Sequence, residues 1–149
     1  MPVQADDLDD LVVGPPLVAA ALQAAVYQHL VADGALAAVV GSAIYDAVPA
    51  GTGQGTFVSI GPEDVRDRSD QTGAGAEHDF VVSVITDAAG FAKAKAAATA
   101  VSDALIGAPL VLTRGALIGL WFLKAVARRG DRGSVRRIDL TFRARVEDN

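Results

Sequence analysis

Residues 137–146 read RIDLTFRARV, the clearest alternation of apolar and polar residues in the chain. Successive side chains of a β-strand point to opposite faces, so this pattern predicts a strand with one buried and one solvated face. The apolar positions are Ile138, Leu140, Phe142, Ala144 and Val146, and the polar ones are Arg137, Asp139, Thr141, Arg143 and Arg145. We therefore expect a strand over 135–146, joined by residues 129–133 to a strand over 116–128, as a hairpin.

The same reasoning along the chain predicts a single domain with a short, acidic, mobile arm in front of it. In the first half of the chain we expect a helix over 15–30, a short helix over 35–40, a brief extended piece at 43–45 and a strand over 57–60. A long exposed loop over 64–76 should follow. After it we expect a central strand at 79–86 that is covered on both faces, and a helix over 91–106. The fold class is thus α+β, a mainly antiparallel sheet packed against one or two helices. The arm is expected over 1–14 and the domain over 15–149.

Composition excludes several classes of protein. The 149 residues are 51% hydrophobic and contain no Cys, so the chain needs no disulfide, has no thiol chemistry and suits a reducing bacterial-type cytoplasm. Its apolar runs are too short to span a bilayer, and we expect no membrane partner. Residues 1–113 carry 4 basic and 14 acidic side chains, whereas residues 114–149 carry 9 and 4. Such an asymmetry suits a protein that sits between two surfaces or between copies of itself.

The residues offer little for catalysis. The run GTGQGTFVSIG, residues 51–61, has glycines at alternate positions, but a strand follows it where a phosphate-binding loop would open a helix. We interpret it as a flexible loop that leads into a strand. His29 lies on the apolar line of the first helix, which favours a packed or capping role. His78 stands between Glu77 and Asp79 in a strand, where neighbours face opposite sides, so an interface or edge-strand role is favoured over a base.

No metal-ligand spacing and no nucleophile motif occurs, so we expect no enzyme activity, no metal and no cofactor. Basic side chains cluster at the tip of the C-terminal hairpin, where they could meet nucleic acid phosphates. They are not interleaved with aromatic residues and the chain is acidic overall, so an acidic partner or another copy is favoured. The basic residues concerned are Arg128, Arg129, Arg132, Arg136 and Arg137, with Arg143 and Arg145 beyond them.

Four segments, taken in order, resemble a known family. They are LAAVVGSAIYDAVP at 36–49, FVSIG at 57–61, HDFVVSVIT at 78–86 with Gly90 and the helix ending at Leu105, and LTFR at 140–143. The family is the tail-completion or tail-terminator proteins of long-tailed, siphovirus-type phages and of gene transfer agents. The resemblance covers roughly 17–147, leaves the acidic arm outside, and departs at Ile85, where many relatives have tryptophan.

The resemblance implies a structural protein that forms a hexameric ring, caps the tail tube and ends its polymerisation. Such a ring docks to the head-side connector, or stopper, and double-stranded DNA passes through it without sequence recognition. The implied location is the bacterial cytoplasm during assembly and then the head–tail junction of a virion or gene-transfer-agent particle. The residues expected at intersubunit or tube interfaces are Arg66, Arg68, His78, Arg128, Arg129 and Arg132. A small α+β ligand-binding domain and a nucleic-acid-binding accessory domain remain as alternatives.

Overall fold

The fold is a five-stranded sheet with three helices on one side. The computed structural model describes residues 16–46, 55–67, 75–107, 109–129 and 135–147. The elements are α2 (Pro16–Val31), α3 (Gly34–Val40), β1 (Ile44–Tyr45), β2 (Thr56–Asp67), β3 (Gly75–Thr86), α4 (Ala92–Gly107), β4 (Ala116–Arg129) and β5 (Arg136–Glu147). The strand order is β1-β2-β3-β5-β4, with β1 parallel to β2 and every other pair antiparallel. The α+β prediction is confirmed. The predicted N-terminal arm lies outside the described residues.

The buried face of β5 matches its sequence pattern position by position. Its five apolar side chains, at 138, 140, 142, 144 and 146, are all at most 4% exposed. The ring of Phe142 stacks on Phe80 of β3 at 5.6 Å between centroids and meets Phe122 of β4 edge-on at 5.8 Å. Aromatic pairs in these arrangements add to the stabilisation that comes from burial alone. This cluster ties the three strands together at the centre of the sheet.

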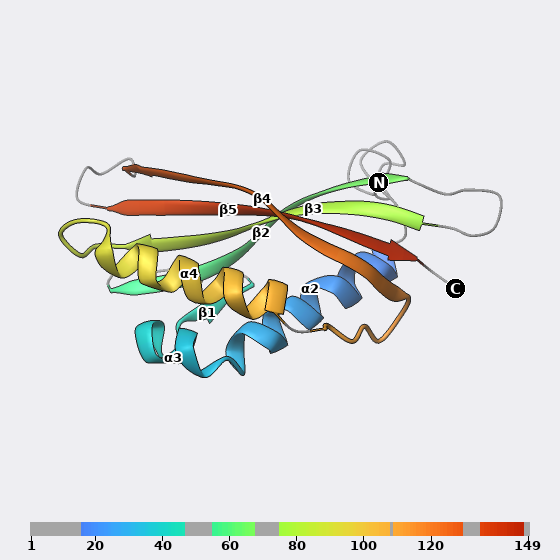
Figure 1. Ribbon diagram of the computed structural model, residues 1–149, viewed down its shortest axis with the longest axis horizontal. Coiled ribbons are helices and arrows are strands. Elements are labelled where there is room, and N and C mark those ends of the chain that lie inside the picture. Colours follow the sequence, from blue (N-terminus) through green and yellow to red (C-terminus); the bar gives the residue numbers. More distant parts are fainter. Residues whose placement is uncertain (1–15, 47–54, 68–74, 108, 130–134, 148–149) are drawn as a thin grey trace, which may run out of the picture.

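The three helices cover one face of the sheet only (Figure 1). Apolar residues of α2 and α4 pack onto the inward-facing side chains of β3 and β5. On the opposite face, Asp79 and Arg143 form an ion pair. The expectation that β3 is covered on both faces is therefore wrong, because no described helix lies over its outward apolar residues, Val81 and Ile85, which are only partly buried (Figure 1). We call these two faces the inner and the outer face.

Two helix ends are fixed by side chains. Asp33 Oδ2 accepts a hydrogen bond from the backbone N–H of Leu36 at 2.9 Å and so caps the N-terminus of α3. His29 Nε2 donates to the carbonyl of Ala104 at 2.8 Å. That carbonyl lies in the last turn of α4, where carbonyl groups have no partner within the helix. The packed or capping role predicted for His29 is confirmed, as a cap on α4.

Strand β2 is longer than expected. It runs to Asp67, and its second half pairs with β3 from Glu63 to Asp67 after a bulge between Ile60 and Glu63. The expected loop at 64–76 is therefore wrong at both ends, since residues 64–67 and 75–76 are in strands. Cross-strand pairing of Val65 with the buried His78 outweighs the polar composition that favoured a loop. The rest of that loop lies outside the described residues.

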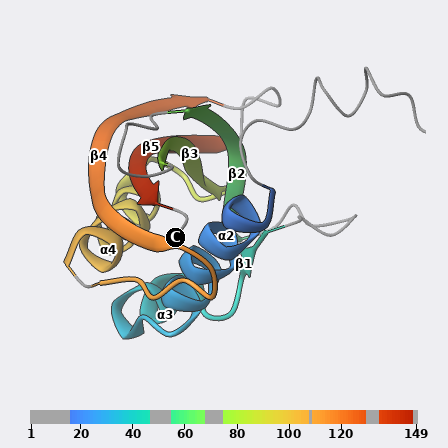
Figure 2. The ribbon, with the colours of Figure 1, turned by 90° about the vertical axis from the view of Figure 1, so that its right-hand side faces the viewer.

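Strand β4 is an edge strand that bends around the molecule. In Figure 2 it sweeps round one side, with β2 on the opposite side and β5 and β3 between them. The predicted hairpin of β4 and β5 is confirmed, with Arg129 paired to Arg136 at its end. The two edges of the sheet, β4 and the β1–β2 side, therefore lie on opposite sides of the molecule (Figure 2).

Candidate assembly interface

The outer face of the sheet carries a network of charges that crosses three strands. Arg143 of β5 donates two hydrogen bonds to Asp79 of β3, from Nε at 2.8 Å and from Nη2 at 2.9 Å. Such two-pronged pairs are well oriented because the guanidinium fork matches the carboxylate. The hydrogen bond to Asp79 raises the pKa of Arg143, and the charges of Asp79 and Glu77 act in the same direction. The paired charges leave this part of the face close to neutral.

Asp139 is the centre of the second half of this network. It accepts hydrogen bonds from Ser83 Oγ at 2.7 Å, Arg137 Nε at 2.8 Å and Arg128 Nη2 at 2.8 Å. Partial burial alone would raise the pKa of Asp139. The hydrogen bonds from Ser83 and Arg137 and the nearby positive charges outweigh that effect, so its pKa lies below the usual value.

The arginines that the sequence predicts at interfaces lie in different environments. The side chain of Arg128 is 56% exposed but is held by Asp139, and Arg129 is exposed at the end of β4. Arg66 lies in β2 rather than in a loop. Arg68 and Arg132 fall outside the described residues. The structure thus places Arg128 and Arg129 together at one end of the edge strand.

His78 is completely buried on the inner face, at 0% exposure, in a strand that is paired on both sides. The edge-strand role predicted for it is wrong, and its side chain has no exposed surface in the single subunit, while the interface role stays a prediction. As predicted, it does not share its face with Asp79. Its partner is Glu63 of β2, whose Oε2 accepts a hydrogen bond from His78 Nδ1 at 2.5 Å. Sequence reasoning missed this pair because Glu63 lies 15 residues away, directly before the segment 64–76 that was expected to be a loop.

A row of exposed apolar side chains on β4 is the main feature that sequence reasoning missed. We call it the β4 strip: Ile118, Trp121, Phe122, Leu123 and Val126, which are between 42% and 57% exposed. Bulges near Ile118 and Leu123 interrupt the regular alternation of side chains between the two faces of β4. The sequence did contain a signal, because three large apolar residues in a row, at 121–123, must place at least one on the solvated face of an edge strand.

The hollows on the surface do not resemble a catalytic centre. A groove of about 360 Å³ runs between α4 and the inner side of β4, and its floor includes Ala98, Ile138 and Leu140. A smaller hollow of about 260 Å³ lies between α2 and the bulge of β2. Within the described ranges no group of three or more His, Cys, Asp or Glu side chains could hold a metal ion, and no helix there is long and apolar enough to cross a membrane. What these surfaces offer is area and charge for contact with other proteins.

Comparisons with known proteins agree with that interpretation. Residues 24–147 match the family described as tail completion protein gp17. Among solved structures, a chain of one described as "Virion of native gene transfer agent (GTA) particle" is 73% identical, with 87% of this chain and 97% of that chain covered and a TM-score of 0.83. No curated protein matches. The chain therefore belongs to the tail completion protein family and is a structural protein rather than an enzyme.

Proposed function

We propose that six copies of this protein form a ring that caps the tail tube, ends its polymerisation and supplies the docking surface for the head-side connector. Double-stranded DNA passes through the ring without sequence recognition. The protein is made in the bacterial cytoplasm and then resides at the head–tail junction of a virion or gene-transfer-agent particle. The observation that carries the proposal is the 73% identity to a chain of a structure described as a gene transfer agent virion.

Surface charge supports the ring. A ring of identical subunits needs one surface on each copy that fits a different surface on the next. The C-terminal hairpin carries the basic excess, with Arg128 and Arg129 at the end of β4, while the segment before residue 114 is acidic. We expect contacts to neighbouring subunits at Arg128, Arg129 and Arg132, and to subunits or the tube at Arg66 and Arg68.

Neither alternative is favoured by a specific observation. A ligand-binding domain is expected to present a deep hollow with converging polar groups, whereas the groove beside β4 is floored by aliphatic side chains. A nucleic-acid-binding surface needs unpaired cations, whereas Arg128, Arg137 and Arg143 are each bound to a carboxylate.

The test is electron microscopy of particles from a producing strain that lacks this chain. We expect overlong tail tubes together with DNA-filled heads that carry no tails. Restoring the wild-type chain should restore tails of uniform length attached to heads. Normal tailed particles in the deletion strain would overturn the proposed function.

A second measurement addresses the basic end of β4. Arg129→Glu reverses an exposed charge, and we expect fewer joined particles while the monomer remains folded, as judged by circular dichroism. Arg128→Glu is a poorer choice, because it would set a carboxylate against Asp139 and so disturb the outer-face network.

A further inference from the structure

We propose that the ring contact is made between opposite edges of the sheet: the β4 strip of one copy packs against the acidic β1–β2 edge of the next copy. This inference rests on the proposed ring and names the two surfaces that would form it. The surface that covers the β4 strip thus belongs to a second copy of this chain.

We expect the exposed apolar side chains of the β4 strip to be covered by another protein surface. Five of the eight large apolar side chains that are exposed in the described part of the chain lie on this one strand. Edge strands that face water are normally short, or are protected by charges, proline or a covering loop. Strand β4 has 14 residues, and its charges, at Lys124, Arg128 and Arg129, are confined to its second half. Clustered exposed apolar side chains on such an edge mark a contact surface.

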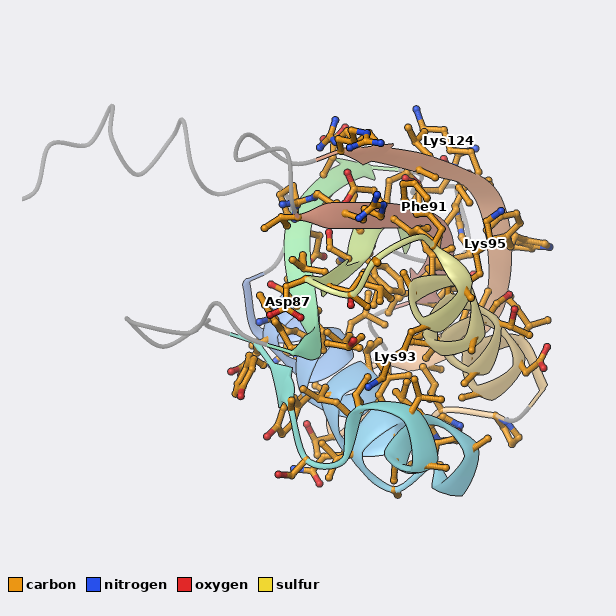
Figure 3. All side chains as sticks on the ribbon, turned by 90° about the vertical axis from the view of Figure 1, so that its left-hand side faces the viewer. Asp87, Phe91, Lys93, Lys95 and Lys124 are labelled. Carbon is orange, nitrogen blue, oxygen red and sulfur yellow. The ribbon has the colours of Figure 1, made fainter. Side chains whose placement is uncertain are left out.

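The charged residues of strand β4 itself are all positive, and one of them, Arg128, is paired with Asp139 of β5. Strand β4 contains no acidic residue. Lys95, on the rim of the groove between α4 and β4, adds to the three cations of the strand. Figure 3 shows Lys95 on α4 and Lys124 on β4 on the same side of the molecule. A complementary surface must therefore combine apolar and acidic groups.

The other edge of the sheet has that combination. Strand β1 has only two residues and pairs with β2 only at Val58 and Ser59, so the rest of β2 has no described strand on that side. Asp46 and Asp64 are exposed along this edge, and Arg66 is the one cation in β2. Beside Asp46 opens the hollow of about 260 Å³. Most of its lining is apolar, with two carboxylates: Leu22, Val26, Ile60, Pro62 and Phe80, with Asp46 and Glu63.

Geometry favours a contact between unlike edges over a contact between like edges. Two β4 strips face to face would bring the Lys124 side chains of both copies towards one another, and like charges at an interface are unfavourable. The acidic edge lies at the opposite end of the strand order (Figure 2). A contact between opposite edges is head-to-tail, and such a contact closes into a ring when the rotation between copies allows it.

The contact is made by side chains rather than by a continuous sheet. Pro62 lies in β2 next to the bulge and has no backbone N–H to donate. We therefore expect apolar side chains of the β4 strip to enter the hollow between α2 and β2, while Lys124 faces Asp64. In their own sheets both of these residues lie on the outer face, opposite Thr141 and Asp79 respectively.

The absence of Cys from the sequence allows a clean cross-linking test in particles. A chain carrying both Leu123→Cys and Asp64→Cys should, with a short bis-maleimide, give a ladder of covalent multimers up to the full ring. Each single variant should stay uncross-linked. A chain with Ala20→Cys and Asp103→Cys, both exposed on helices, is the matched control and should give no ladder. Dimers from Leu123→Cys alone would overturn the inference, because they would place two β4 strips together.

Charge exchange gives a second readout that needs no cross-link. We expect Lys124→Glu and Asp64→Lys each to lower the yield of tailed particles about tenfold or more, and the double exchange to recover most of it. If the double variant recovers nothing and the paired cysteines give no ladder in normal particles, the edge contact is wrong while the ring stands. The proposed function, by contrast, fails if the strain lacking the chain makes normal tails.

Discussion

At the scale of single residues, Asp139 shows how the outer face of the sheet is held together. Its carboxylate accepts from Ser83 of β3, Arg137 of β5 and Arg128 of β4. Three neighbouring strands are thus joined through one acidic side chain that is only 17% exposed. Because the partners are charged or well oriented, this carboxylate contributes more than an ordinary surface pair.

We expect Asp139→Asn to destabilise the protein in a pH-dependent way. The pKa of Asp139 is lower in the folded state than its usual value, so the ionised group stabilises the fold above the unfolded-state pKa, about 4. That stabilisation is lost as the pH falls through the folded-state pKa. Urea unfolding of wild type and variant should therefore differ at pH 7 and converge in acid. A constant difference down to pH 2 would contradict the assignment.

Phe142 should be among the most costly residues to truncate. It is fully buried and contacts the rings of both Phe80 and Phe122. Phe142→Ala should lower the free energy of unfolding by about 3–5 kcal/mol, since it removes apolar contact and leaves a cavity. Thr141→Ala, the neighbour on the outer face, is the control and should cost less than about 1 kcal/mol. Chemical denaturation measures both, and equal losses would contradict the assigned faces.

At the scale of elements, the accuracy of sequence reasoning depended on how local the stabilising contacts are. Residues 137–146 alternate strictly, so the faces of β5 could be predicted without knowledge of its neighbours. The second half of β2 could not, because its strand state depends on pairing with β3 and on the Glu63–His78 hydrogen bond. The β4 strip was missed for a related reason, since its exposure follows from the edge position of β4.

Hydrogen exchange distinguishes a strand from a loop in β2. The amides of residues 63–67 that face β3 should exchange slowly, as should those of residues 57–60, because both halves of β2 are paired. The amides that face the open edge should exchange faster, and they serve as the internal control. Fast exchange at every amide of residues 63–67, with protection at 57–60, would restore the loop interpretation.

At the scale of the whole molecule, the core and the proposed contact surface lie mainly on different strands of one sheet. Inner-face residues of β3 and β5 are buried under α2 and α4, so the subunit has a core of its own. Phe122 of the β4 strip contacts that core through Phe142, but all five side chains of the strip remain about half exposed. A subunit that has a core of its own and also exposes an apolar edge is suited to a partner that covers this edge on assembly.

The only tryptophan of the chain reports on this edge. The indole of Trp121 lies over Gly119, where a Cβ would fall 2.5 Å from it, and is half exposed in the single subunit. Its emission should therefore be that of a partly hydrated indole in the monomer and should move to shorter wavelength when subunits assemble. Iodide should quench the monomer and spare the assembled form. Ala96→Trp in a Trp121→Phe background places the reporter on the exposed side of α4 and should show no shift. If assembled rings leave the emission and the quenching of Trp121 unchanged, the β4 strip is not buried between subunits.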